Sequence, residues 1–413
     1  MLAVLLAIGA SGEAVGPADR LAGLSLLERA VLTLQHEGAD RVLVVLRPQH
    51  EPLLGALRAD RRVRAVLEAV GVAEGEDLAA ALVARLDADA RFVAARHDVL
   101  AQPALYRRLW EAELGDRLGL LAVREGEPAG PFTGRAAVLD GLSAAAPAAL
   151  LERLRQSPAV GELAVEGAWI ESLSERQGRA RAVSHLFDAC RKPVDGIVAR
   201  HLNRHASIFI SKRLVDTPVS PNATSLVVLL VSVAAAGFVA LGGYGWTLLG
   251  AALLQAGSVL DGVDGELARV RFQQSRLGQW LDTLADDISN VLFCAGLGWG
   301  ARSLAWGAVL AWCGGVAAGG AALAAAIYYV ELVQLGSGDL YAIEWSFDRD
   351  PRTAGAKALA LVHQTLKQDF FIFLFFCLAL VGVLPYALPL CAAGAVATAG
   401  AAATRAIQRL RSK

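Results

Sequence analysis

Four aspartates with regular spacing lie in the most apolar half of this 413-residue chain. Asp261 and Asp264 are three residues apart and Asp282 and Asp286 are four apart, so on helices each pair shares one face. An aspartate near hydrocarbon is unfavourable unless it faces a polar cavity, a partner or an ion. Two such faces turned toward each other would form an oxygen cage suited to a hard cation such as Mg²⁺ or Mn²⁺.

Small residues lie near these aspartates, so few side-chain atoms cover the backbone there. Gly265, Ala268 and Gly278 lie in the same stretch of sequence. Because they lack bulky side chains, a large ligand can approach the backbone closely there. The stretch therefore predicts a cation site beside an open surface for a large ligand.

The composition changes along the chain, which predicts more than one domain. Up to about residue 215 apolar runs alternate with Arg, Asp and Glu, as in a soluble α/β protein, and after Pro221 long runs of Ala, Leu, Val, Gly and Phe dominate. The formal net charge of −1 does not indicate a class of partner. We expect no nucleic-acid partner. The five cysteines form no CxxC pair, so we expect buried thiols and not a disulfide or zinc framework.

Residues 1–180 predict an α/β domain with strands and helices in alternation. The expected strands are residues 2–8, 41–46 and 92–95, and the expected helix is residues 24–37. We interpret the opening MLAVLLAIGASGEAV as a strand and a glycine turn and not as a signal peptide, because no basic region precedes its short apolar run. The alternation predicts a mainly parallel, Rossmann-like sheet, with ligands at the strand ends where the glycine turn and Asp98 fall.

Residues 181–213 predict a basic amphipathic helical link. Basic and apolar side chains alternate in it, and the basic ones include Arg191, Lys192, Arg200, Arg204, Lys212 and Arg213. Such a helix suits an anionic membrane surface, and we expect membrane lipids as partners. An ordinary solvated helix is the alternative.

Residues 214–413 predict an all-α domain with six transmembrane helices. The apolar segments are about 223–243, 246–263, 278–299, 304–330, 368–384 and 386–404. The basic residues gather in the link, in the 266–276 turn and in the C-terminal tail. The positive-inside rule therefore predicts an integral inner-membrane protein with both termini, the acidic site and the 331–367 loop on the cytoplasmic side.

The string from Asp261 to Asp286 fits the pattern D-x2-D-G-x2-A-R-x8-G-x3-D-x3-D without a mismatch. This string resembles the signature of the CDP-alcohol phosphotransferase (CDP-alcohol phosphatidyltransferase) family, and the resemblance covers roughly 190–413. It implies transfer of a substituted phosphoryl group from a CDP-linked donor to an alcohol, with release of CMP. It also implies a homodimer.

The resemblance implies a role for each position of the pattern. Two Mg²⁺ or Mn²⁺ ions are held by Asp261, Asp264 and Asp282, and Asp286 touches a metal and is the candidate general base. The implied CDP contacts are Gly265, Ala268, Arg269, Gly278, Asn222 and Ser225. Ser225 stands where threonine is commoner in the family. The alternative is that the aspartates only cap helices or pair with Arg269 and Arg271.

Other charged residues near the apolar segments have weaker assignments. Lys212 and Arg213 precede the first apolar segment and are candidates for an acceptor phosphate, with membrane-surface anchoring as the alternative. We interpret Lys367 and Asp369 as anchors at a helix end. We expect Glu266, Asp287, His201 and His205 to be solvated, interfacial or supporting groups and not ligands.

The first domain is similar to sugar-phosphate nucleotidyltransferases, in which a glycine loop cradles the triphosphate. The resemblance implies that Gly9, Gly12 and Arg20 belong to that loop region and that Asp98 is a metal-binding aspartate. Together with the string KPVDGIVARHLNR, the chain resembles the bifunctional inositol-1-phosphate cytidylyltransferase and di-myo-inositol-phosphate-phosphate synthase family. In that family the soluble half makes CDP-inositol and the membrane half joins it to a second inositol phosphate.

Two departures concern the chemistry of the first domain. Where the family has a Pro-Lys pair after the glycine loop, this chain has Pro17-Ala18-Asp19-Arg20. Where a D-x-D-like run should supply a second metal ligand, it has Trp169-Ile170-Glu171-Ser172-Leu173. We therefore expect a nucleotidyltransferase fold that is impaired or retuned, and that binds a nucleotide or serves as a scaffold.

The leading hypothesis is a membrane CDP-alcohol phosphotransferase with a polar donor, such as CDP-inositol, and a phosphorylated polyol acceptor. The first alternative is a phospholipid synthase of the same family that uses CDP-diacylglycerol. The second is a carboxylate-lined cation transporter, which leaves the glycines and Arg269 unexplained.

Overall fold

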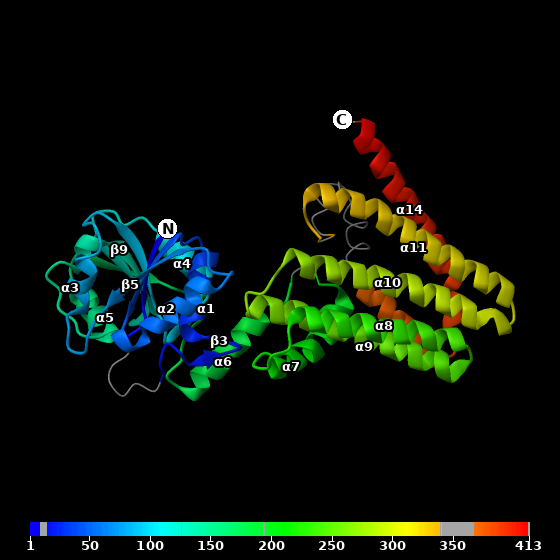
Figure 1. The fold of residues 1–413 in the computed structure, drawn as a ribbon, viewed down its shortest axis with the longest axis horizontal. Helices are drawn as coiled ribbons and strands as arrows, with labels where there is room; N and C mark the ends of the chain where they lie inside the picture. Colours follow the sequence, from blue (N-terminus) through cyan, green and yellow to red (C-terminus); the bar gives the residue numbers. More distant parts are fainter. Residues whose placement is uncertain (9–14, 125, 193–194, 339, 341–366, 412–413) are drawn as a thin grey trace. The chain divides into compact units, whose positions relative to one another are not determined.

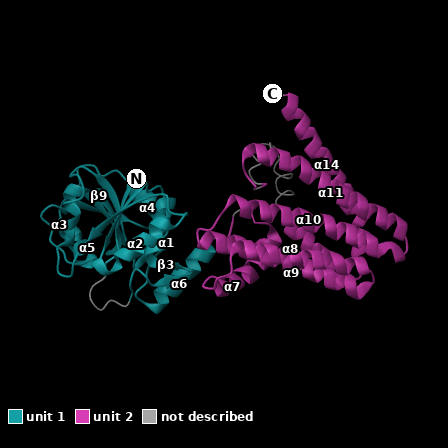
Figure 2. Cartoon of the chain, in the orientation of Figure 1, with its two compact units in different colours: residues 1–188 teal, residues 189–413 magenta. Residues whose placement is uncertain are grey.

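The computed structural model describes residues 1–8, 15–124, 126–192, 195–338, 340 and 367–411 (Figure 1). The chain forms two compact units, residues 1–188 and residues 189–413 (Figure 2). Gly9 and Gly12 of the expected glycine turn lie outside the described residues, as does most of the 331–367 loop.

A seven-stranded sheet forms the centre of the first unit. In spatial order its strands are β10 (Val160–Ala164), β8 (Gly119–Arg124), β9 (Glu127–Arg135), β6 (Arg91–Arg96), β1 (Leu2–Leu6), β4 (Arg41–Leu46) and β5 (Val66–Gly71). Strand β9 is antiparallel to β8 and β6, and the other neighbours are parallel. The mainly parallel α/β sheet is confirmed, and the opening run is a strand with a neighbour on each side.

Apolar residues on both faces of the strands explain why the sheet has two cores. In β1, Val4 and Leu6 pack into one core while Ala3 and Leu5 pack into the other, because successive side chains point to opposite faces. The covering helices are α1 (Leu26–His36), α2 (Glu51–Ala59), α3 (Leu78–Val83), α4 (Ala104–Glu111) and α5 (Pro147–Gln156), and α6 (Arg176–Asp188) ends the unit. Short 3₁₀ turns are η1 (Pro48–His50) and η2 (Ala136–Leu139).

Two short antiparallel pairs lie outside the main sheet. Strands β2 (Arg20–Leu21) and β3 (Leu24–Ser25) form a hairpin, and β7 (Val99–Ala101) pairs with β11 (Ile170–Ser172). In the second pair Glu171 lies opposite Leu100, and the backbone N–H of Leu173 donates to the carbonyl oxygen of Asp98 at 2.8 Å. Residues more than 70 positions apart in the sequence are therefore neighbours in this unit.

The second unit is helical. Its helices are α7 (Arg204–Leu214), α8 (Pro221–Leu241), α9 (Tyr244–Val270), α10 (Arg276–Gly300), α11 (Gly307–Leu335), α13 (Gln368–Leu380) and α14 (Leu388–Arg411). Short turns are η3 (Ala199–Asn203), which is a π-turn, and the 3₁₀ turns η4 (Ala301–Ser303) and η6 (Leu384–Ala387). Helices α8, α9 and α10 lie side by side (Figure 1).

Local signals set the ends of the helices that carry the site. Helix α8 begins where the Ser220 hydroxyl accepts from the N–H of Ala223, and α10 begins where Ser275 accepts from Gly278. Gly242 and Gly243 have φ of 72° and 76°, which lets the chain turn sharply between α8 and α9.

Among the described residues, four helical segments are long and apolar enough to cross a membrane: α8, α9, α11 and Leu384–Arg411. Helix α13 is apolar but has only 13 residues, and α10 is interrupted by acidic side chains. All six expected apolar segments are thus helical, while six complete spans remain a prediction.

The expected basic link is not one continuous membrane-facing helix. Its first part belongs to α6 of the first unit, and its last part lies in η3 and α7. Ile197 and Phe209 are exposed, as a membrane-surface helix requires. Arg204, however, is buried in an ion-pair network within the second unit, so it does not serve as a surface cation.

Candidate active site

Helices α9 and α10 bring three of the four aspartates together. One carboxylate oxygen each of Asp261, Asp264 and Asp282 lies within 4.8 Å of the other two. The helical spacing explains this, because Asp261 and Asp264 share a face of α9 while Asp282 lies in the second turn of α10. Three carboxylates this close repel one another unless a cation or protons lie among them.

Ser225 of α8 holds the most buried of these carboxylates. Its hydroxyl donates to Oδ2 of Asp264, and both residues are buried. The sequence pattern implies a CDP contact for Ser225, whereas the structure gives it a hydrogen bond to a candidate metal ligand. A hydrogen bond of this kind orients a ligating carboxylate.

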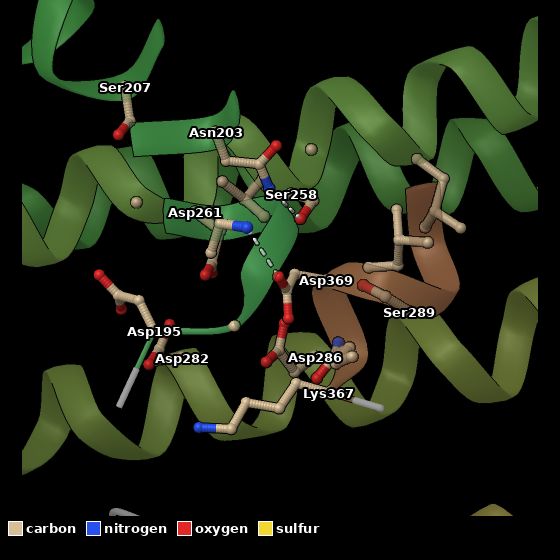
Figure 3. Close-up of a pocket in the computed structure, with 18 of the residues that line it drawn as sticks. Asp195, Asn203, Ser207, Ser258, Asp261, Asp282, Asp286, Ser289, Lys367 and Asp369 are labelled. Carbon is tan, nitrogen blue, oxygen red and sulfur yellow. Dashed lines mark hydrogen bonds between the residues drawn. The ribbon is translucent and has the colours of Figure 1, made fainter. Parts of the chain in front are cut away.

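Asp286 lies one helical turn beyond Asp282 and is not part of the three-carboxylate group. It lines a cavity of about 230 Å³ together with Asp261 and Asp282, and we call this space the polar cavity (Figure 3). The side chains of these three residues come from α9 and α10 and border the same space. Asp286 is therefore placed to meet a ligand that enters from the cavity side.

A second space, bordered by Asp264 and Asp282, contains all six candidate CDP contacts. We call it the glycine pocket, and its lining includes Asn222, Ser225, Gly265, Ala268, Arg269 and Gly278. Four glutamine and serine side chains from the α9–α10 turn and the start of α10 complete its rim: Gln273, Gln274, Ser275 and Gln279. No large apolar side chain is among the described residues of this lining.

The small residues of the glycine pocket are necessary for its shape. A Cβ atom on Gly265 would lie 3.2 Å from the Arg269 guanidinium, and one on Gly278 would lie 3.2 Å from the Ser275 hydroxyl. The Nε of Arg269 is buried and has no hydrogen-bond partner among the described residues. An unsatisfied buried donor beside an open pocket suits an anionic ligand.

The polar cavity is lined mostly by polar and charged groups. Asparagine and serine side chains contributed by several helices are Asn203, Ser207, Ser232, Ser258, Ser289 and Asn290. Figure 3 shows the hydrogen bond from Asn203 to Ser258, which measures 3.1 Å. Val228, Leu254 and Ile372 are the large apolar residues of the described lining. Such a lining suits a hydroxyl-rich ligand better than a lipid chain.

Two lysines that the sequence pattern did not mark as ligands border the polar cavity. They are Lys192 and Lys367, and Lys192 also borders the glycine pocket. The candidates Lys212 and Arg213 line neither space, and the Arg213 guanidinium lies 3.4 Å from the centre of the Phe209 ring. The structure therefore offers Lys192 and Lys367 as further candidates, and the acceptor-phosphate assignment of Lys212 and Arg213 stays a prediction.

Asp369 is more than a helix-end anchor. Its Oδ2 accepts a hydrogen bond from the backbone N–H of Ala199 at 2.7 Å, where the π-turn begins (Figure 3). A Cβ atom on Gly196 would collide with the Asp369 carboxylate. The glycine of the KPVDG string thus permits α13 to hold the 195–199 segment at the edge of the polar cavity.

Glu266 is fully buried and is not a solvated group. It accepts hydrogen bonds from the hydroxyls of Ser207 and Ser211, both at 2.6 Å, and from Arg204 at 3.0 Å. The same Arg204 donates to both carboxylate oxygens of Asp195, at 2.9 and 3.0 Å. Burial alone would raise the pKa of Asp195, but the hydrogen bond and charge of Arg204 outweigh it and lower the pKa.

The alternative in which the aspartates cap helices or pair with Arg269 and Arg271 is weakened for Arg271, which bonds to backbone carbonyl groups. The Arg271 guanidinium is buried and donates to the carbonyl oxygens of Leu214, Val215, Thr217 and Val219. It therefore fixes the α7–α8 connection to the end of α9. Asp287 accepts from the Tyr329 hydroxyl at 2.6 Å and belongs to a contact between α10 and α11.

In the first unit, Asp98 and Glu171 border one cavity, together with Arg96, Arg124 and Arg181. Arg20 is not part of this lining, and its guanidinium donates to the carbonyl oxygen of Gly23 at 2.7 Å. The structure therefore brings the two candidate metal carboxylates of this unit together without Arg20.

Comparisons with known proteins agree with this division of the chain. The family model described as CDP-alcohol phosphatidyltransferase matches residues 219–384. A "Bifunctional IPC transferase and DIPP synthase" from Rubrobacter xylanophilus is 32% identical over 324 residues, which cover 69% of this chain and 73% of that protein. Because this share exceeds the helical unit, the similarity extends into the α/β unit.

Solved structures resemble each unit separately. Phosphatidylinositol phosphate synthase from Mycobacterium tuberculosis with CDP-DAG bound is 19% identical, covers 50% of this chain and 92% of its own, and has a TM-score of 0.35. The inositol-1-phosphate CTP transferase from T. maritima is 16% identical, covers 43% of this chain and 90% of its own, and has a TM-score of 0.35. With 32% identity over most of the Rubrobacter protein and a matching family model over the aspartate helices, the chain belongs to the CDP-alcohol phosphatidyltransferase family of transferases.

Proposed function

We propose that the helical unit transfers a substituted phosphoryl group from a polar CDP-alcohol to a phosphorylated polyol and releases CMP. The observation that carries the proposal is that the aspartates border both the polar cavity and the glycine pocket, with Asp282 common to the two. The glycine pocket suits a cytidine diphosphate, and the polar cavity suits a hydroxyl-rich acceptor. The curated relative named as a bifunctional IPC transferase and DIPP synthase supports inositol phosphates as the class of substrate.

The carboxylates fit a pair of divalent cations, with Mg²⁺ or Mn²⁺ as the proposed ions. Asp261, Asp264 and Asp282 offer only oxygen donors within 4.8 Å of one another, and the Ser225 hydroxyl holds Asp264 in place. Bound there, the cations would neutralise the diphosphate and stabilise the negative charge of departing CMP.

The residues around the cations have separate roles in the proposed reaction. The acceptor hydroxyl oxygen forms a bond to the donor phosphorus that carries the alcohol, and the bond from that phosphorus to the bridging diphosphate oxygen breaks. CMP leaves with the bridging oxygen. Asp286, on the cavity side, accepts the proton of the acceptor hydroxyl. Arg269 contacts the diphosphate of the donor.

The acceptor phosphate is proposed to bind Lys192 and Lys367. Both lysines border the polar cavity, and Lys192 lies where the two spaces meet. The asparagine and serine side chains deeper in the cavity then hydrogen-bond the polyol hydroxyls. A lipid acceptor or donor would need a continuous apolar wall, whereas Val228, Leu254 and Ile372 are the large apolar side chains among the described residues of the two linings.

Several features of the whole protein belong to the same proposal. The apolar helices place it in a membrane, as expected of its family, and the basic link, turn and tail support cytoplasmic termini and a cytoplasmic active site. We also propose a homodimer in contact with membrane lipids. A cation transporter would need the carboxylates but would not need Gly265, Gly278 or Arg269 in the glycine pocket.

The test is CMP release by the purified full chain in detergent with Mg²⁺. CDP-inositol with inositol phosphate should support turnover, and unphosphorylated inositol should be a poor acceptor because it does not engage the lysines. CDP-diacylglycerol with the same acceptors should release little CMP. Efficient turnover of CDP-diacylglycerol, with none of CDP-inositol, would replace the proposal with a phospholipid synthase.

A further inference from the structure

The α/β unit contains two buried carboxylates where its resemblance to nucleotidyltransferases implies a divalent cation. Asp98 and Glu171 border one cavity because β7 pairs with β11. Each carboxylate side chain is only 7% exposed. In a metal site such groups would offer their oxygens to the cation.

Both oxygens of Asp98 are already bonded to one arginine. The Nε of Arg96 donates to Oδ1 at 2.8 Å, and an Nη of the same guanidinium donates to Oδ2. This two-pronged contact is the strongest geometry between arginine and a carboxylate. Arg96 is itself largely buried, at 17% exposure, so solvent weakens the pair little.

Both oxygens of Glu171 also have partners, which come from successive turns of α6. Arg181 donates from Nε to Oε2 at 2.7 Å, and Nε2 of His185 lies 3.3 Å from Oε1. The His185 ring stacks on Trp169 with the ring centres 4.7 Å apart. The imidazole is therefore held against the carboxylate by packing as well as by polar contact.

These partners oppose binding of a divalent cation. The two carboxylates carry a charge of about −2, and the two guanidiniums cancel it because arginine does not deprotonate in proteins. At Glu171, Arg181 is 55% exposed and can turn into solvent. At Asp98, a cation would have to displace the largely buried Arg96 and leave it near its own positive charge. That exchange is unfavourable in a partly buried site. The residues of this unit therefore do not fit the metal that its resemblance implies.

We infer that the α/β unit holds no divalent cation between Asp98 and Glu171 and does not make a CDP-alcohol from CTP. In that reaction a phosphate oxygen of an alcohol phosphate would bond to the α-phosphorus of CTP, and pyrophosphate would leave with the bridging oxygen. The ion pairs of Arg96 with Asp98 and of Arg181 with Glu171 occupy the carboxylates that would have to bind a cation in that reaction. A separate cytidylyltransferase reaction then supplies the CDP-alcohol donor of the helical unit, a conclusion that rests on the proposed function.

The first experiment measures pyrophosphate released by the full chain from CTP, Mg²⁺ and inositol 1-phosphate. Release should not exceed that of a protein-free control. The same preparation must release CMP from CDP-inositol, which shows that it is folded. Pyrophosphate release at a rate comparable to CMP release would overturn the inference, and because the two products are distinct, failure of the proposed function would show separately as absent CMP.

The second experiment counts Mn²⁺ ions bound to the full chain by electron paramagnetic resonance. The double variant Asp98→Asn/Glu171→Gln should bind as many ions as the wild type, because the arginines and not a cation occupy these carboxylates. Asp261→Asn is the control and should lower the count. A loss of one bound ion in the double variant would overturn the inference even if no pyrophosphate were detected.

Discussion

Replacement of Ser225 by alanine should weaken the affinity of the enzyme for its metal and leave donor recognition nearly intact. The Ser225 hydroxyl donates to Oδ2 of Asp264, and both groups are buried. In the alanine variant this carboxylate loses its fixed donor and can rotate away from the position that completes the three-carboxylate group. The Ser225→Thr variant keeps the hydroxyl and is the matched control.

The size of the effect follows from the type of hydrogen bond. A hydrogen bond to a charged group contributes about 1.5–3 kcal/mol. At about 1.36 kcal/mol for each factor of ten, the loss corresponds to roughly 10- to 150-fold. Removal of a group that orients a metal ligand costs about 10- to 100-fold in metal affinity or activity, which agrees with that range.

The assay is CMP release as a function of Mg²⁺ concentration at saturating donor and acceptor. Ser225→Ala should shift the half-saturating Mg²⁺ concentration upward by about 10- to 100-fold and recover much of its kcat at high Mg²⁺. Ser225→Thr should remain close to the wild type. If Ser225→Ala instead raised the KM for the CDP-alcohol and left the Mg²⁺ curve unchanged, Ser225 would be a nucleotide contact and the reasoning from the Asp264 hydrogen bond would be refuted.

Three further predictions concern the polar cavity. Asp286→Asn should lower kcat by roughly 10²- to 10⁴-fold, as expected for loss of a general base, and should change the donor KM little. If kcat and the donor KM changed by equal factors, Asp286 would not be the general base. Gly196→Ala should raise the acceptor KM about tenfold or more, because the added methyl displaces Asp369, while the donor KM stays constant; an unchanged acceptor KM would count against this contact. Asp195 has a lowered pKa in the folded protein because Arg204 outweighs its burial, so its stabilising contribution is present above its unfolded pKa, near 3.8, and is lost as pH falls through the folded value. The melting temperatures of the wild type and Asp195→Asn in detergent should therefore differ most near neutral pH and converge in acid. A difference that stayed constant with pH would disprove the link between the Asp195–Arg204 pair and stability.

Sequence spacing was sufficient to predict the architecture that positions the aspartates. The apolar runs at 2–8, 41–46 and 92–95 became neighbouring strands of a mainly parallel sheet, since a buried parallel strand needs a continuous apolar run. The i,i+3 spacing of Asp261 and Asp264 placed them on one face of α9 for the same local reason. Local periodicity carries this information because it does not depend on distant parts of the chain.

The partners of charged groups were much harder to predict. Glu266 and Arg204 lie 62 residues apart, yet they pair in the interior. Lys192 and Lys367 lie even further apart, and they border the same cavity. No pattern in the sequence links such residues, because the folding of several helices onto one another decides which of them meet.

The sequence by itself determined the membrane family, the α/β and helical halves and the four aspartates that mark the site. These features depend on composition and on short spacings in the sequence, because residues three or four apart share one face of a helix and alternate residues share one face of a strand. Only the tertiary structure decided that Ser225 supports Asp264, that Asp286 faces a separate polar cavity, and that arginines neutralise Asp98 and Glu171. Electrostatic partners across a fold are set by packing over long sequence separations, and the charge of a buried group depends on those partners.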